Sequence, residues 1–366
     1  RLESRRRVRT RSDPTFGWGL AGLIGRVGVS YDSAMTFRPD RPTGCLAPVL
    51  LGEVVSDPES IRAMARGNGP YFMPARYLID GQAADQAGDG VRRGRSDVPA
   101  HLVGPTWRGD WAVRGRAVVP GAEALLHHEG FRAAAVSMTG GTEVVPEQVF
   151  VNLTTPSRSQ GFSHTDIPEF VGVNRTNAPG WLLQAMGVSR LFEDVRITIV
   201  TAVTWFHRGE RGFFRYWPEG RDSGSLRHED VWNTGVVGDN DFMHHQVEGT
   251  GPRGAVPPEG LTIDTELRHD GSRWLVVDDD VVLADFDEAE VRLSLSWKAK
   301  VYRNGADRRE AESGVGGIGL DEVLARFATV EDLDVPGGVP VNPDEALVHD
   351  GFRSALTTRW HGYRSD

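Results

Sequence analysis

The chain contains a single cysteine, Cys45, in 366 residues. One thiol excludes an internal disulfide framework and any structural zinc site built from cysteines. This cysteine usage is typical of a reducing compartment, so we expect a cytoplasmic protein. Long apolar runs are also missing: the longest, such as residues 197–206, contain threonine and are far shorter than the roughly 20 residues of a membrane-spanning helix. We therefore expect no membrane partner.

Acidic residues outnumber basic ones once the start of the chain is set aside. The net charge is −10, yet residues 1–11 carry six arginines and one glutamate, which leaves −15 on the remainder. An acidic body argues against a surface that follows nucleic-acid phosphates, so no nucleic-acid partner is expected. We interpret residues 1–11 as a disordered basic terminus or a cloning remnant and exclude them from the fold.

The composition favours turns and strands over long helices, because the chain has 44 glycines and 21 prolines. Strand-like runs of apolar and β-branched residues dominate from residue 149 onward. They cover residues 149–153, 196–206, 213–217, 231–237, 242–247, 274–283 and 291–302. A β-rich α+β fold with a sandwich or barrel core is expected.

Three regions follow residues 1–11. Residues 12–148 mix strand and helix signals and are interpreted as an N-terminal α/β wrapping region, with helices expected over 56–66 and 120–131. Residues 149–302 form the predicted catalytic core, interrupted by a helix over about 180–194 that is expected to cover one face of the sheet. Residues 303–366 read as a C-terminal helical extension, with helices over 320–330 and 342–356. Nothing in the sequence fixes the oligomeric state.

Three residues suggest a metal centre. His164 and Asp166 are two positions apart in an extended segment, so their side chains point to the same side. His245 follows His164 by 81 positions. Two histidines and one carboxylate can occupy one face of an octahedral iron and leave the opposite positions open for oxygen chemistry. His244 is the alternative third ligand, but only one of two adjacent strand residues can face the ion, and we favour His245.

The last predicted core strand, residues 291–302, has two different faces. Apolar side chains alternate with Arg292, Ser294, Ser296 and Lys298. A strand with this pattern often turns its polar face to water. An arginine followed two residues later by serine can also hold a dicarboxylate, because the planar guanidinium matches a carboxylate and the hydroxyl adds a bond on the same face.

Taken in order, these segments resemble the signature of Fe(II)/2-oxoglutarate-dependent oxygenases. The residues that carry the resemblance are His164-Thr165-Asp166, His245-Gln246-Val247 and Arg292-Leu293-Ser294, and the run from Asn152 to Pro156 also looks like bacterial members that act on small molecules. The resemblance covers residues 149–302 and identifies no subfamily. It implies a double-stranded β-helix (jelly-roll, cupin-like) core with flanking helices and N- and C-terminal extensions.

The resemblance also implies roles for individual residues. His164, Asp166 and His245 would bind Fe(II), and Arg292 with Ser294 would bind the distal carboxylate of 2-oxoglutarate, with Asn152 as a further cofactor-binding residue. One spacing departs from the family, because its anchoring arginine usually follows the distal histidine closely. Here Arg292 comes 47 positions after His245.

Two explanations for this spacing remain open. Either an insertion over about 249–287 separates the last two core strands, or Arg253 is the anchor. Arg253 lies in a Gly-Pro-Arg-Gly turn. A turn fixes a side chain less firmly than a central strand does, so we favour Arg292.

The expected activity is oxidation of a small-molecule substrate with O2 and 2-oxoglutarate, releasing succinate and CO2, in bacterial biosynthesis. Asp166 occupies the place where related halogenases have a small residue. Hydroxylation, desaturation, epoxidation or cyclisation is therefore favoured over halogenation. Two alternatives stay open: a metal-free jelly-roll binding or structural protein, and a cupin-like hydrolase or isomerase that uses zinc or manganese.

Overall fold

The structure is a computed structural model that describes residues 45–74, 76, 103–159, 161, 163–360 and 363–364. The chain divides into two compact units, residues 1–32 and 33–366, and every described residue belongs to the second unit. The interpretation of residues 1–11 as a disordered terminus lies outside the described residues.

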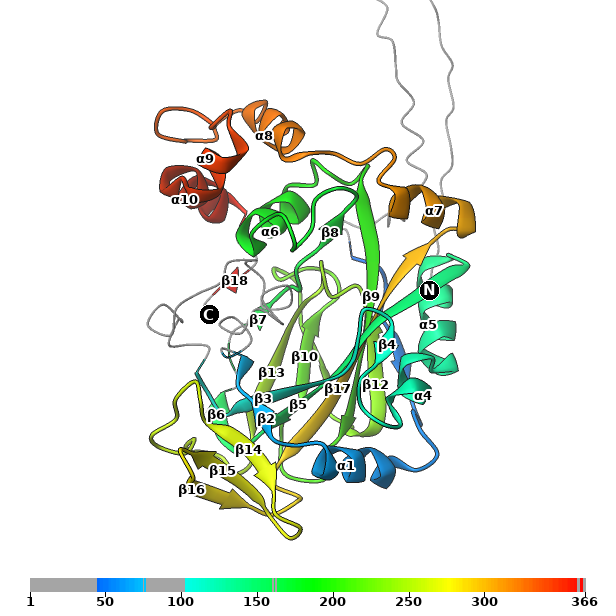
Figure 1. Cartoon of the computed structure of the whole chain (residues 1–366), viewed down its shortest axis with the longest axis vertical. Helices are drawn as coiled ribbons and strands as arrows, with labels where there is room; N and C mark the ends of the chain where they lie inside the picture. The colour runs from blue at the N-terminus through cyan, green and yellow to red at the C-terminus, as the bar shows by residue number, and fades with distance from the viewer. Residues whose placement is uncertain are drawn as a thin grey trace, which may run out of the picture. The chain divides into compact units, whose positions relative to one another are not determined.

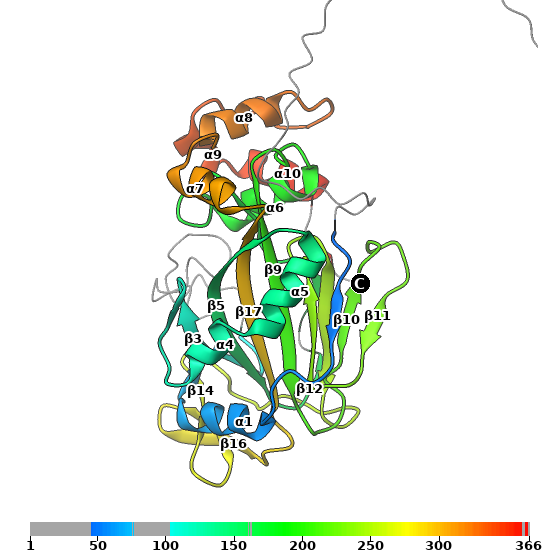
Figure 2. The same cartoon turned by 90° about the vertical axis from the view of Figure 1, so that its right-hand side faces the viewer.

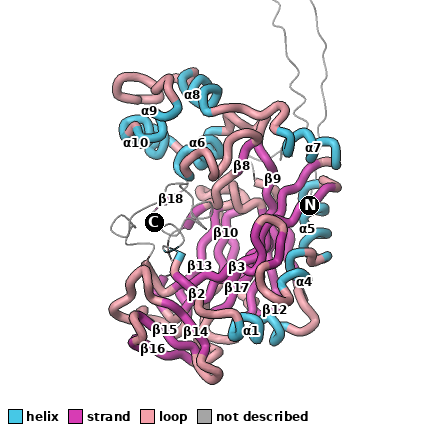
Figure 3. The backbone as a smooth tube through the Cα atoms, viewed as in Figure 1, coloured by secondary structure: helices cyan, strands magenta, loops and turns pink. Residues whose placement is uncertain are grey.

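Two antiparallel sheets form the centre of the described unit (Figures 1 and 3). The large sheet runs in the order β1 (Val49–Leu51), β12 (Trp232–Gly238), β9 (Arg196–Phe206), β17 (Arg292–Tyr302), β5 (Glu143–Thr154), β3 (Thr106–Val113), β2 (Tyr71–Phe72), β14 (Glu266–His269), β15 (Trp274–Asp278) and β16 (Val281–Phe286). Two short strands join it: β4 (Arg116–Ala117) pairs with β3, and β8 (Glu169–Phe170) pairs with β9. The small sheet runs in the order β11 (Leu226–His228), β10 (Phe214–Trp217), β13 (His244–Thr250), β7 (Ser163–His164) and β18 (Tyr363–Arg364), and β6 (Ser157–Ser159) pairs with β13.

Eight of these strands have the order of a double-stranded β-helix. Counted along the chain, they are β5, β7, β9, β10, β11, β12, β13 and β17. The large sheet places the first, eighth, third and sixth side by side, and the small sheet places the second, seventh, fourth and fifth side by side. Apart from the hairpin of the fourth and fifth strands, successive strands therefore alternate between two facing sheets, as in a jelly roll. The predicted fold class is confirmed.

The strand β17 lies at the centre of the large sheet, between β5 and β9. Its apolar side chains, including Leu293, Leu295 and Trp297, belong to the main hydrophobic core. Figure 2 shows helices α4 (Ala122–Leu126) and α5 (Glu129–Thr139) over this outer face. Its polar side chains consequently point to the inner side, toward the small sheet.

A second hydrophobic cluster joins four helices. It includes α6 (Gly180–Ser189), α8 (Leu320–Ala328), α9 (Pro343–Val348) and α10 (Asp350–Arg359), while α7 (Gly305–Ser313) follows β17 directly. The helix expected near 180–194 is α6, which ends at Ser189, packs against α10 and shares its hydrophobic cluster with Phe170 of β8. The buried residues of α6 lie on all sides of the helix, so neighbouring segments cover it on several sides.

Two predicted helices are each divided in two. The segment 120–131 forms α4 and the start of α5, and the segment 342–356 forms α9 and most of α10. In both cases a histidine precedes the second helix and its side chain caps it: His128 accepts from the Phe131 N–H, and His349 accepts from the Phe352 N–H. Histidine is not among the usual N-cap residues, so the sequence pattern did not reveal these breaks. The segment 56–66 corresponds to α1 (Pro58–Gly67).

The residues between β13 and β17 form an additional three-stranded unit. The strands β14, β15 and β16 pair in a meander, and β14 also pairs with β2, so they extend the large sheet at its far edge (Figure 1). This insertion accounts for the long spacing between His245 and Arg292. Within the described ranges, no helix has the length and apolar character needed to cross a membrane.

Candidate metal centre

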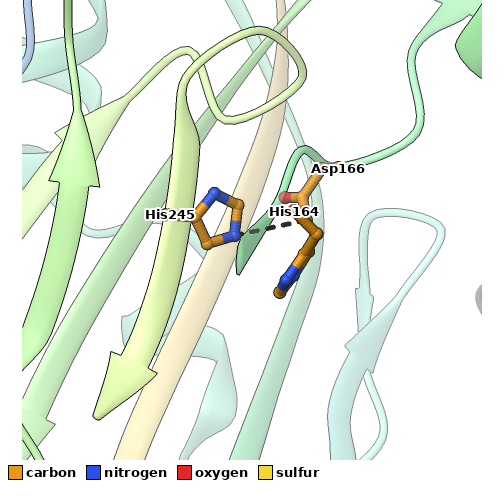
Figure 4. Close-up of side chains that lie close together, drawn as sticks. All are labelled: His164, Asp166 and His245. Carbon is orange, nitrogen blue, oxygen red and sulfur yellow. Dashed lines mark ion pairs between the residues drawn. The ribbon is translucent and has the colours of Figure 1, made fainter. Parts of the chain in front are cut away.

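The pairing of β7 with β13 brings the two histidines together. His164 and His245 are direct partners in this antiparallel pair, and their ring centroids lie 4.5 Å apart. Paired residues of neighbouring antiparallel strands point to the same side. Figure 4 shows both rings beside Asp166, which follows β7 by two residues.

Asp166 completes the group. Its backbone N–H donates to the Asn240 carbonyl over 2.8 Å, which ties the segment after β7 to the turn before β13. Its Oδ1 lies 3.7 Å from His245 Nε2. One ligand atom from each of His164, Asp166 and His245 lies within 4.8 Å of the other two. This spacing and donor set fit one divalent ion with open positions.

His245 is oriented for ligation through Nε2. The side chain is 7% exposed, and its Nδ1 lies 2.9 Å from the Met243 carbonyl. A carbonyl can only accept, so Nδ1 carries the proton and Nε2 presents its lone pair. Burial, together with the charge of His164, lowers the pKa of His245 to about 4. The ring is therefore neutral at physiological pH, as a metal ligand must be.

Lys298 is a site residue to which the sequence analysis gave no role. Its Nζ lies 2.6 Å from Asp166 Oδ2. Burial of Asp166 alone would raise its pKa, but the positive charge of Lys298 and the nearby histidines outweigh burial and lower it. The carboxylate is therefore ionised. The signal was present in the sequence, because Lys298 lies on the same face of its strand as Arg292.

Arg292 lies further along the same inner face and is 1% exposed. Its Nε donates to the Gly212 carbonyl over 2.7 Å and its Nη1 donates to Ser294 Oγ over 3.1 Å, while Nη2 has no partner in the described part of the chain. No acid among the described residues forms an ion pair with it. Burial lowers its pKa to about 9, so the guanidinium is still charged at neutral pH. A buried cation without an acidic partner fits an anionic ligand.

Gly212 permits this placement of the arginine. Its φ is +70°, and a Cβ at this position would lie 2.6 Å from Arg292 Cδ. Both the left-handed backbone and the close approach therefore require glycine.

The other predicted cofactor residues lie beside Arg292 in the sheet. Asn152 on β5 is the register partner of Ser294, and Thr154 is the register partner of Arg292. The Thr154 hydroxyl is buried and has no hydrogen-bond partner within the ranges that the structure describes. The polar inner face thus continues from β17 onto β5.

The two alternative site residues lie elsewhere. Arg253 is exposed in a turn of the insertion after β13. His244 belongs to the other face of β13, because it pairs in register with Trp217 whereas His245 pairs with Tyr216. Neither is brought to the group formed by His164, Asp166 and His245.

His207 is a second buried group that the sequence analysis did not assign to the site. It follows β9, is 2% exposed, and has a pKa lowered to about 4 by burial and then by the charge of Arg292. The ordinary pKa is 6.5, so between pH 6.5 and about 4 the unfolded chain binds a proton that the folded chain does not. The free energy of unfolding should therefore fall as the pH is lowered through this window.

Replacing His207 by leucine should make that decline shallower. One proton corresponds to a slope of at most about 1.4 kcal/mol per pH unit. Urea unfolding of the metal-free protein at several pH values between 7 and 4 measures it. His127→Leu is the matched control, because the His127 side chain is 55% exposed. Equal slopes in His207→Leu and the original protein would contradict the assignment.

Comparisons with known proteins give structural matches only. No protein-family model matches the chain, and no curated protein matches its sequence. An oxidoreductase of the 2OG-Fe(II) oxygenase family from Burkholderia pseudomallei shares 12% identity over 70% of this chain and 87% of its own, with a TM-score of 0.35. A prolyl-4-hydroxylase from Pseudomonas putida shares 13% identity over 70% and 94%, with a TM-score of 0.31. HygX from Streptomyces hygroscopicus, with nickel, 2-oxoglutarate and hygromycin B bound, shares 10% identity over 70% and 83%, with a TM-score of 0.33.

These similarities are too low to assign an activity. The strand order and side chains of this chain establish a double-stranded β-helix in which His164, Asp166 and His245 lie together on the inner side.

Proposed function

We propose that the protein is an Fe(II)- and 2-oxoglutarate-dependent oxygenase that oxidises a small molecule. One observation carries the proposal: the inner side of the jelly roll carries three potential metal ligands and a buried arginine for which the described residues provide no acidic partner. A divalent cation and a dicarboxylate satisfy both features together. A metal-free binding protein gives no reason for the three clustered ligands, and a zinc or manganese hydrolase would account for the charge of Arg292 only with an anionic substrate.

Each group has a defined part in this proposal. His164, Asp166 and His245 hold iron on one face, and Arg292 with Ser294 fixes the distal carboxylate of the cosubstrate, with Asn152 beside them. When bound, iron, 2-oxoglutarate and O2 supply the oxidising chemistry and yield succinate and CO2. The protein contributes the orientation of the bound groups and a partly buried, polar setting. Because Asp166 provides a carboxylate ligand, we propose hydroxylation or a related oxidation rather than halogenation.

The biological setting is part of the same proposal. The acidic body favours a neutral or cationic small molecule over a polyanion. A role in bacterial biosynthesis remains a prediction from the sequence. Screening candidate metabolites for those that stimulate succinate release would identify the substrate.

The first test is an anaerobic titration of the metal-free protein with Fe(II) and then 2-oxoglutarate. We expect a weak visible charge-transfer band that needs both additions, and slow succinate formation when O2 is admitted. Metal binding without any effect of 2-oxoglutarate would instead favour a cupin-like hydrolase or isomerase. Binding of neither would leave a jelly-roll binding protein.

A further inference from the structure

The two oxygens of Asp166 have different neighbours. Oδ1 lies 3.7 Å from His245 Nε2 and thus faces that histidine, whereas Oδ2 lies 2.6 Å from Lys298 Nζ. The lysine comes from β17, six residues beyond Arg292 and on the same inner face. One strand therefore supplies both a cation for the candidate cosubstrate and a cation for the candidate carboxylate ligand.

We propose that Lys298 is a positioning residue that restricts Asp166 to a single metal-binding oxygen. The inference rests on the proposed function. A carboxylate can bind a divalent ion through one oxygen or through both. If both oxygens of Asp166 bound, they would occupy one of the positions that the cosubstrate and O2 need. The charge-assisted bond from Lys298 holds Oδ2 away from the metal.

The position of Lys298 suits this role. It pairs in register with Gln148 of β5 and Thr201 of β9, so its backbone is fixed on both sides. The side chains of Lys298 and Asp166 are only 18% and 20% exposed. Water therefore screens their attraction less than it screens a surface pair.

A second acid close to Lys298 does not compete with Asp166. Asp241 is 3% exposed, and neither of its oxygens has a hydrogen-bond partner among the described residues. Burial raises its pKa to about 8, despite the charge of Lys298. In the structure the ammonium group forms its ion pair with Asp166 rather than with Asp241.

The chain offers a closely matched control. Lys300 lies two residues further on the same face of β17, and its Nζ is 2.7 Å from Glu169 Oε1. The side chains of this pair are 21% and 23% exposed. Glu169 is not one of the three clustered residues, so Lys300→Met removes a similar ion pair without releasing a candidate ligand.

The experiment compares Lys298→Met, Lys298→Arg and Lys300→Met with the original protein. Calorimetry measures the affinity of each metal-free protein for Co(II), and the charge-transfer band measures the affinity of each Fe(II)-loaded protein for 2-oxoglutarate. Loss of a residue that orients a metal ligand typically costs about 10–100-fold in metal affinity or activity. A second bound Asp166 oxygen would add a bond to the metal and take a position that the cosubstrate needs, so we expect the cost here to fall on 2-oxoglutarate binding. We expect Lys298→Met to weaken 2-oxoglutarate binding by about this factor while Co(II) binding stays the same or tightens. Lys298→Arg should restore most of the affinity, and Lys300→Met should match the original protein.

X-ray absorption of the Co(II)-loaded proteins gives a readout that does not depend on turnover. We expect a second Asp166 oxygen within bonding distance of the metal only in Lys298→Met. Any of three results would overturn the inference. Lys298→Met could keep its 2-oxoglutarate affinity, Lys300→Met could lose as much 2-oxoglutarate affinity as Lys298→Met does, or Lys298→Met could lose Co(II) affinity in parallel. Failure of the original protein to bind Fe(II) or 2-oxoglutarate would overturn the proposed function itself, so the two failures are distinct.

Discussion

Replacing His245 by alanine should abolish metal binding, whereas replacing its neighbour His244 should leave it intact. The imidazole of His245 is buried, its Nδ1 is held by the Met243 carbonyl, and its Nε2 faces Asp166. Loss of a residue that only orients a ligand already costs about 10–100-fold in metal affinity, so loss of a direct ligand should cost more than about 100-fold. Calorimetric titration of the metal-free variants with Co(II) measures the affinity.

The adjacent histidine makes this test specific. His244 lies on the other face of the same strand, so His244→Ala changes the local sequence equally but not the candidate ligand set. His245→Gln, which retains bulk beside Phe214, should fail as His245→Ala does, and this separates loss of the ligand from loss of packing. The proposed centre is wrong if His245→Ala binds metal normally, or if His244→Ala loses binding to the same extent.

The sequence predicted those parts of the site that depend on local geometry. A spacing of two in an extended segment places His164 and Asp166 on one side whatever the fold around them. The alternation along β17 separates a buried apolar face from a polar one, and the structure has Leu293 in the core and Arg292 on the inner side. The alternation of side chains along a strand is set by its own backbone, so it can be predicted without knowing which strands pair with it.

Features that depend on distant contacts could not be predicted in this way. The partner of Lys298 lies 132 residues away in the chain, and no local pattern reveals this pairing. The break between α4 and α5 depends in part on His128, whose Nε2 lies 2.8 Å from the Val54 carbonyl. The position of α6 likewise depends on α10, which is far away in the sequence. Tertiary contacts, rather than intrinsic preference, decide each of these features.

Replacing Arg292 by methionine should weaken 2-oxoglutarate binding by about 10–100-fold. A hydrogen bond that involves a charged group contributes roughly 1.5–3 kcal/mol, and this range corresponds to one to two powers of ten in affinity. Metal affinity should be unchanged, because Arg292 contacts Gly212 and Ser294 rather than the three clustered residues. Titration of the Fe(II)-loaded variants, followed by the charge-transfer band, measures the effect.

The same variant should be at least as stable as the original protein when no cosubstrate is bound. A buried charge destabilises the folded state when no acid pairs with it, as for Arg292 among the described residues, and methionine fills much of the same volume without that charge. Adding 2-oxoglutarate to the Fe(II)-loaded proteins should then raise the thermal midpoint of the original protein but not that of Arg292→Met. Arg253→Ala is the control, because that exposed side chain lies in the insertion. If Arg253→Ala lost cosubstrate affinity and Arg292→Met kept it, the anchor would lie in the turn, and the buried guanidinium would need another explanation.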